Sequence, residues 1–141
     1  MREPINPQDL AVPQVISPKA HGIIDYCHAA FFLTLGLICS RSEKRAAKRA
    51  ATAAFAPGGF VLVQSLLTDY RYGATPVIPF RIHGKMDAVF AASSWMMPLL
   101  LGFRGTAAAK IFEMNSLAES GVVAMTDWSS NRAHEERRLA A

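Results

Sequence analysis

The chain has 141 residues, of which 51% are hydrophobic and 18% charged, with a net charge of +4. At this length we expect one domain or one membrane bundle, and the charged fraction is low for a soluble protein. The basic residues accompany no nucleic-acid-binding motif, so we predict no nucleic-acid partner. Cys27 and Cys39 lie in an apolar stretch without a Cys-x-x-Cys motif, which argues for small buried hydrophobes and against a disulfide framework. The proline-rich start argues against a cleaved secretory signal.

Three uncharged runs and a fourth, weaker apolar segment follow one another along the chain. A helix needs about 20 predominantly apolar residues to cross the hydrocarbon core of a bilayer. Each segment reaches that length once its polar ends are included, although Lys110, Glu113 and Glu119 interrupt the fourth. The pattern predicts an all-α protein, a four-helix transmembrane bundle, and a soluble bundle of unusually apolar helices is the alternative. The expected helices cover roughly 18–39, 48–68, 80–103 and 107–126.

Two short motifs each occur twice, in the same order and at nearly the same separation. The motif [K/R]-x-H-G-x-x-D occupies 19–25 and 81–87, at an offset of 62 residues. The motif T-D-aromatic occupies 68–70 and 126–128, at an offset of 58 residues. Two motifs that recur together indicate a duplicated unit of two helices, opened by the first motif and closed by the second.

An even number of helices per unit returns the chain to its starting side of the membrane. We therefore predict a single membrane domain, 1–141, built from two parallel αα-hairpin repeats that are related by an axis along the membrane normal. The repeats cover about 17–70 and 78–128, and polar tails cover 1–16 and 129–141.

This topology gathers both copies of each motif at one membrane face. Each motif aspartate follows its histidine by four residues, so the two side chains share a helix face. Asp69 and Asp127 end their helices, where the helix dipole is negative, so each needs a cation from a helix start. The glycine after each histidine lets helices approach closely. The expected constellation, a ring that ties the hairpins together, comprises Lys19, His21, Asp25, Asp69, Arg81, His83, Asp87 and Asp127.

The paired histidines leave three roles open. We favour structural pairing of His21 and His83 with the carboxylates, and proton handling or ligation of a haem or pigment are the alternatives. His28 lies one turn deeper on the same face, but Phe90 occupies the equivalent place in the second repeat, so His28 cannot belong to a symmetric site. No metal-binding motif occurs, so we predict no metal and favour no cofactor.

The fourth expected helix carries two carboxylates, Glu113 and Glu119, that cannot face lipid without a cost in free energy. Lys110 precedes Glu113 by three residues and can pair with it on one helix face. Glu119 has no obvious partner nearby. A hydrogen-bonded carboxyl group that faces the bundle is favoured, and a proton or cation site or a contact with a partner protein is the alternative. The candidate hydrogen-bond partners of Glu119 are Gln64, Ser65, Asn115 and Ser116.

The segment 41–49, with the sequence RSEKRAAKR, holds five basic residues between the first two expected helices. Basic residues in short loops stay on the cytoplasmic side. We therefore predict a multi-pass protein of the bacterial inner membrane, with this basic loop in the cytoplasm and both termini outside. The loop is also suited to contact anionic lipid.

The segment 68–103 reads TDYRYGATPVIPFRIHGKMDAVFAASSWMMPLLLGF. It resembles the SPW-repeat type of small bacterial membrane protein in its TDY turn, its proline-bearing approach, and a His followed four residues later by an Asp. A Ser-Trp pair and a Gly-Phe pair complete the match, although the central proline of the family pattern is absent and Pro98 lies further on. The resemblance implies an integral membrane protein of two-helix repeats and carries no defined activity. The matching residues are His83, Asp87, Ser94, Trp95, Gly102 and Phe103.

Three classes of function remain, and no enzyme motif supports a fourth. We favour a small structural or accessory membrane protein that packs against a larger complex. The alternatives are a proton, ion or small-solute pathway through the bundle, and a membrane protein that binds haem, a pigment or a quinone through His21 and His83. The expected partners are membrane lipid and other membrane subunits or further copies of the chain.

Overall fold

The computed structural model describes residues 12–140, so residues 1–11 of the predicted N-terminal tail, and residue 141, lie outside the described part. Over 12–140 the chain forms five helices and no strand beyond two isolated bridges, which confirms the all-α prediction. The helices are α1 (Pro18–Ser40), α2 (Arg45–Leu67), α3 (Phe80–Leu100), α4 (Ala107–Met125) and α5 (Ser130–Arg138).

The ends of the four long helices follow from local chemistry. Ser17 caps α1 by accepting a hydrogen bond from the amide of Ala20, and Pro18 occupies the first helical turn. The basic run joins α2, which therefore begins three residues earlier than expected. The helix α3 ends three residues earlier than expected, because Gly102 and Gly105 adopt positive φ angles of 69° and 77° in the following turn. Pro57 lies within a continuous α2.

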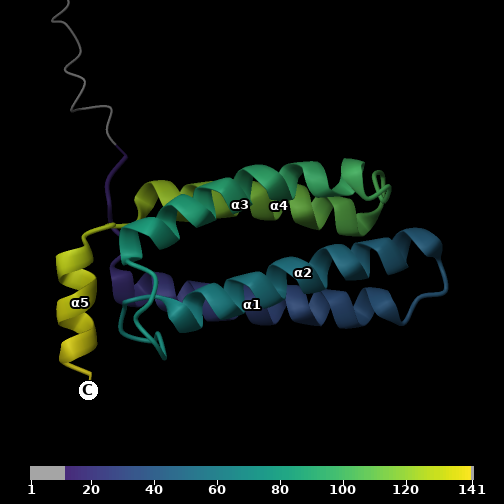
Figure 1. Cartoon of the computed structure of the whole chain (residues 1–141). Coiled ribbons are helices and arrows are strands. Elements are labelled where there is room, and N and C mark those ends of the chain that lie inside the picture. Colours follow the sequence, from purple (N-terminus) through teal and green to yellow (C-terminus); the bar gives the residue numbers. More distant parts are fainter. Residues whose placement is uncertain (1–11, 141) are drawn as a thin grey trace, which may run out of the picture.

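The long helices form two hairpins, in which α1 packs closely on α2 and α3 packs closely on α4. Figure 1 shows the hairpins lying alongside one another, with α5 across the end at which α1 and α3 begin. The predicted C-terminal polar tail is thus a docked helix. Its Ala133 is fully buried against Tyr70 and Phe80, and Ser129 caps it. Docking of α5 closes the end that carries the duplicated motifs.

The interior changes in character along the hairpins. Near the α1–α2 and α3–α4 turns it is an apolar cluster that includes Phe32, Phe103 and Phe112. Near the opposite end the buried side chains include polar groups such as His21, His83 and Gln64, beside the aromatic rings of Tyr70 and Phe80. Two helices, α1 and α2, are long and apolar enough to cross a membrane by length and composition. The sequence suggested buried thiols, whereas Cys27 is exposed on α1 and Cys39 is half-buried against the apolar cluster.

Candidate metal centre

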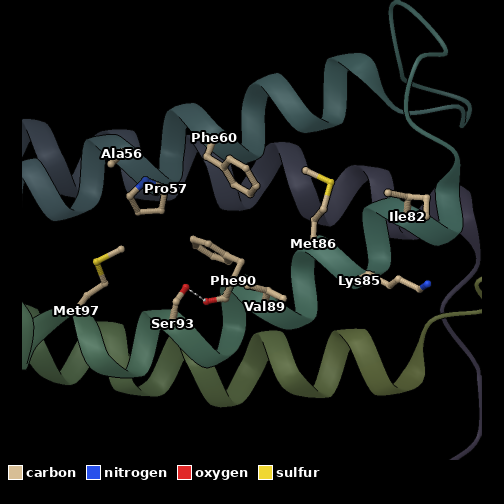
Figure 2. Close-up of a pocket in the computed structure, with 10 residues that line it drawn as sticks. All are labelled: Ala56, Pro57, Phe60, Ile82, Lys85, Met86, Val89, Phe90, Ser93 and Met97. Atoms are coloured by element: carbon tan, nitrogen blue, oxygen red, sulfur yellow. Dashed lines mark hydrogen bonds between the residues drawn. The ribbon is translucent and has the colours of Figure 1, made fainter.

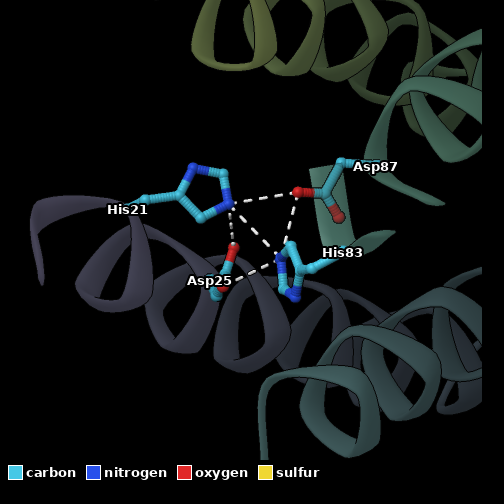
Figure 3. A group of neighbouring side chains, drawn as sticks. All are labelled: His21, Asp25, His83 and Asp87. Atoms are coloured by element: carbon cyan, nitrogen blue, oxygen red, sulfur yellow. Dashed lines mark hydrogen bonds and ion pairs between the residues drawn. The ribbon is translucent and has the colours of Figure 1, made fainter. Parts of the chain in front are cut away.

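Two histidines and two aspartates meet between the hairpins, as Figure 3 shows. His21 and Asp25 come from α1, and His83 and Asp87 come from α3. Both imidazoles are 0% exposed and the aspartates are at most 4% exposed. The four-residue spacing turns each carboxylate towards the same axis as its histidine, so two identical motifs on neighbouring helices build one tetrad.

The ligand atoms of the tetrad are spaced as the corners of a small polyhedron. The Nε2 atoms of the two histidines are 3.3 Å apart. An Asp87 oxygen lies 3.1 Å from Nε2 of His21 and 3.0 Å from Nε2 of His83. Oδ1 of Asp25 lies 3.3 Å from Nε2 of His21, and Oδ2 of Asp25 lies 3.3 Å from Nε2 of His83. Four ligands at about 2.0–2.1 Å from a tetrahedral ion are separated by about 3.3 Å. The Nε2–Nε2 and Nε2–oxygen distances are close to this value, and one ligand atom from each of the four residues lies within 4.8 Å of the others.

Two threonines determine which imidazole nitrogens carry protons. Thr68 and Thr126 donate their hydroxyl protons to the carbonyls four residues earlier, at 2.7 Å and 2.6 Å. Each hydroxyl oxygen also lies within hydrogen-bond distance of a histidine Nδ1, at 2.7 Å from His83 and 3.0 Å from His21. A hydroxyl has one proton to donate, so each threonine accepts from Nδ1–H. With Nδ1 protonated, each imidazole in its neutral form presents the lone pair of Nε2 to the centre of the tetrad, and in its protonated form presents Nε2–H to the aspartates.

The two aspartates are held by different partners. Asp25 accepts a hydrogen bond from the Tyr70 hydroxyl at 3.1 Å, and Asp87 accepts one from the side-chain amide of Gln64 at 2.6 Å. Burial, and next the charge of Asp25, raise the pKa of Tyr70, which keeps its hydroxyl a donor. In the second repeat Trp128 replaces Tyr70 and donates to the carbonyl of Val123 instead, so Gln64 supplies the missing bond. Hydrogen-bonded outer partners of this kind orient metal-binding side chains.

The glycine of each motif makes room for the aromatic residue of its own repeat. A Cβ atom at Gly22 would lie 2.6 Å from the Tyr70 ring, and one at Gly84 would lie 2.7 Å from the Trp128 ring. The sequence suggested that these glycines serve helix–helix contact, whereas each seats a ring beside the tetrad. The two recurrent motifs thus supply metal-type ligands, their hydrogen-bond partners and the wall around them.

The remaining members of the predicted ring lie outside the tetrad. Lys19 and Arg81 are exposed and form no ion pair within residues 12–140. The expected partners of the helix-end aspartates also differ, because docked α5 brings cations of its own. Asp69 lies 3.2 Å from His134, and Asp127 lies 3.0 Å from Arg132.

A second buried pair joins α1 and α4. Nδ1 of His28 lies 2.9 Å from Glu119, and both side chains are 7% exposed. The sequence suggested Gln64, Ser65, Asn115 or Ser116 as partners of Glu119, and missed His28 because the two residues are far apart in the chain. Glu113 is half-buried and makes no ion pair with Lys110 in the described part of the chain.

A separate apolar cavity of about 510 Å³ lies between α2 and α3. Figure 2 shows Pro57 and Phe60 on α2 facing Met86, Phe90 and Met97 on α3. It carries no group suited to bind a metal, so the tetrad is the site at which the chemistry of the chain is concentrated.

The chain matches no family model, no curated protein and no solved structure. The resemblance to SPW-repeat proteins therefore stays a prediction.

Proposed function

We propose that this chain is a small integral membrane protein whose tetrad binds one divalent transition-metal ion. The observation that carries the proposal is the convergence of two Nε2 lone pairs and two carboxylates in a buried site. With no cation and no proton on either Nε2, four electron-rich groups would face one another, at Nε2–Nε2 and Nε2–oxygen distances of 3.0–3.3 Å. Burial of such groups costs several kcal/mol unless they are paired or bind a metal.

Zinc fits the site best. Two imidazole nitrogens and two carboxylate oxygens at tetrahedral separations are a usual ligand set for Zn²⁺. Iron(II) and manganese(II) accept the same donors and are the competing ions. Ligation of haem or a pigment by both histidines is disfavoured, because Nε2 atoms 3.3 Å apart leave no room for a macrocycle between them.

The distribution of polarity supports a membrane-spanning bundle of four helices. Large apolar side chains face outward from all four long helices, with Leu117 and Val89 being 68% and 70% exposed. The ionisable groups at the motif end, including His21, Asp25, His83 and Asp87, are buried. In water such an arrangement would be costly, whereas in lipid the outer face needs to be apolar and ionisable groups belong inside.

Equivalent backbone bonds support the two parallel repeats. The amide of Ile16 bonds the carbonyl of Met125 at 2.9 Å, and the amide of Ile78 bonds the carbonyl of Leu67 at 2.8 Å. Ile16 and Ile78 stand at the same offset of 62 as the histidine motifs. The segment just before α1 is therefore hydrogen-bonded to the end of α4, and the segment just before α3 is hydrogen-bonded to the end of α2.

The basic loop and the exposed apolar faces suggest orientation and partners. The basic segment 41–49 lies at the end opposite the tetrad. Its retention in the cytoplasm would put the tetrad at the outer side of a bacterial inner membrane. An accessory role in a larger complex is the second candidate, because Met114 and Leu117 extend one strongly exposed apolar surface along α4. Native purification tests this role, because an accessory subunit should co-purify with its complex.

Metal analysis of the purified protein tests the proposed function. Protein purified in detergent without chelator should carry one zinc, iron or manganese ion per chain by elemental mass spectrometry. After chelation, readdition of that ion should raise the melting temperature, since an ion at 100 times its dissociation constant stabilises the folded state by about 2.7 kcal/mol. A folded wild-type protein that binds none of the three ions would instead support the alternative in which protonated histidines pair with the aspartates.

Labelling of introduced cysteines tests the membrane topology. In a background without Cys27 and Cys39, cysteines at residue 45 and residue 75 should react from opposite sides of the membrane. Reaction of both from the same side would contradict the hairpin repeats.

A further inference from the structure

The groove between α1 and α4 holds a polar site that the tetrad does not use. It is a cavity of about 340 Å³, and ligand-binding cavities range from about 300 to 1,000 Å³. Apolar side chains, including Ile24, Phe31 and Val122, form most of its lining. Three polar side chains, His28, Asn115 and Glu119, complete it.

Two polar atoms of this groove lack the partners that buried groups normally have. Nδ1 of His28 is engaged by Glu119 at 2.9 Å, whereas Nε2 of His28 is buried without a hydrogen-bond partner among residues 12–140. Nδ2 of Asn115 is likewise buried and unpartnered among these residues. A buried polar atom without a partner destabilises the folded protein unless a donor or acceptor reaches it. Both residues line the same cavity, so one bound molecule is able to serve both.

The chemistry of the two atoms selects the bound group. The Asn115 amide is a donor and needs an acceptor. Nε2 of His28 is an acceptor when Nδ1–H donates to an ionised Glu119, and a donor when a neutral Glu119 donates to Nδ1. A hydroxyl group is both donor and acceptor, so it satisfies His28 in either state while it accepts from Asn115. An ether or ester oxygen lacks the proton and serves only one state.

The depth of the groove selects the rest of the molecule. His28 lies ten residues into α1, roughly 15 Å from its start. That depth is about half the thickness of a hydrocarbon core of roughly 30 Å. A ligand at this depth enters from the lipid, so its body must be apolar.

We propose that the α1–α4 groove binds the hydroxyl group of a lipid-soluble compound between His28 and Asn115, with Glu119 orienting His28. The proposal does not depend on metal in the tetrad. It assigns a use to a histidine that has no equivalent in the second repeat, where Phe90 stands.

A matched pair of probes tests the proposal. Para-octylphenol and its methyl ether have nearly the same shape, but only the phenol carries a hydroxyl proton. Native mass spectrometry of the full chain, with both probes at equal concentration, should find the phenol bound about tenfold more than the ether. Equal occupancy by the two probes, or binding of neither, would overturn the proposal.

The equivalent positions of the opposite repeat supply the control variant. The double change His28→Phe and Glu119→Val installs the residues found at the equivalent positions, Phe90 and Val61, and removes both ionisable groups together. This variant should bind phenol and ether equally, while its helical circular dichroism matches the wild type. A preference for the phenol that survives in the folded double variant would place the hydroxyl elsewhere. Asn115→Leu should reduce the preference without abolishing it, and an unchanged preference would remove Asn115 from the site.

Discussion

The grooves on either side of the tetrad occupy equivalent places and have opposite chemistry. Six of the eight residues that line the α1–α4 groove have equivalents, at the repeat offsets, that line the α2–α3 cavity in Figure 2. In one groove His28 pairs with Glu119, and in the other Phe90 packs beside Val61. At the tetrad, by contrast, both repeats supply the same His, Asp and Thr. The two repeats thus carry the same residues at the tetrad, where their side chains meet. They carry different residues in the two grooves, where the side chains do not meet their equivalents.

The largest expected effect is the loss of metal affinity when one repeat no longer supplies its tetrad carboxylate. Asp25→Asn and Asp87→Asn each replace one ligand by an isosteric amide and remove one negative charge. Each should weaken metal binding by more than about 100-fold, because loss of a ligand costs at least as much as loss of an outer partner. Competition titration with a zinc chelator measures the affinity. The matched control is Asp127→Asn, which should leave metal affinity unchanged. The Asp127 carboxylate forms an ion pair with exposed Arg132 and does not belong to the tetrad.

Much of the fold was predictable from the sequence, because the apolar runs and the helix-capping residues are local signals. The four expected helices match α1–α4 to within three residues at every end. The spacing of His21 to Asp25 likewise predicted a shared helix face. The duplicated motif also predicted that His21 and His83 share one end of the bundle. It did not predict that their Nε2 atoms would lie 3.3 Å apart, because that depends on how far the hairpins approach one another.

The rest of the site depended on contacts between residues distant in the chain. Thr68 and Thr126 are visible in the recurrent T-D-aromatic motif, but only the folded chain places each hydroxyl on the histidine Nδ1 of an adjacent helix end. Docking of α5 brings His134 to Asp69. The buried residue of this helix is the small Ala133, in an otherwise polar and charged segment. Such a segment has no apolar periodicity from which docking is predicted.

The second largest effect tests whether the threonines act through the histidines. Thr68→Val and Thr126→Val keep the side-chain shape and remove the acceptor of Nδ1–H. Outer-shell changes of this kind cost about 10–100-fold in metal affinity. The control is Thr52→Val, since Thr52 also donates to the carbonyl four residues earlier, at 3.3 Å, but is exposed and touches no histidine. Equal affinities for all three variants would show that the threonines do not set the state of the imidazoles.

A third effect compares glycines that seat aromatic rings with one that does not. Gly22→Ala and Gly84→Ala place a methyl group where it would lie 2.6–2.7 Å from a ring atom. Overpacking of this kind should destabilise the folded protein by about 1–3 kcal/mol. Gly59→Ala meets nothing within 4 Å and should be neutral or slightly stabilising. Thermal melts of the three variants in one detergent measure the difference, and similar losses for all three would contradict the seating of the rings.

The smallest effect concerns the one element that belongs to neither repeat. Arg137 on α5 donates to the carbonyls of Tyr70 and Gly73 at 3.2 Å and 2.7 Å, and so holds the loop that follows α2. Arg137→Ala should cost about 1 kcal/mol per lost bond at most, because the site is partly exposed and water replaces the donor. Hydrogen exchange of the amides of 73–78 should quicken, while metal affinity changes by less than about threefold. The tetrad keeps its direct partners on α2 and α4 in this variant. A much larger loss of metal would mean that α5 positions Tyr70 against Asp25, and that the two repeats form a competent centre only with this added helix in place.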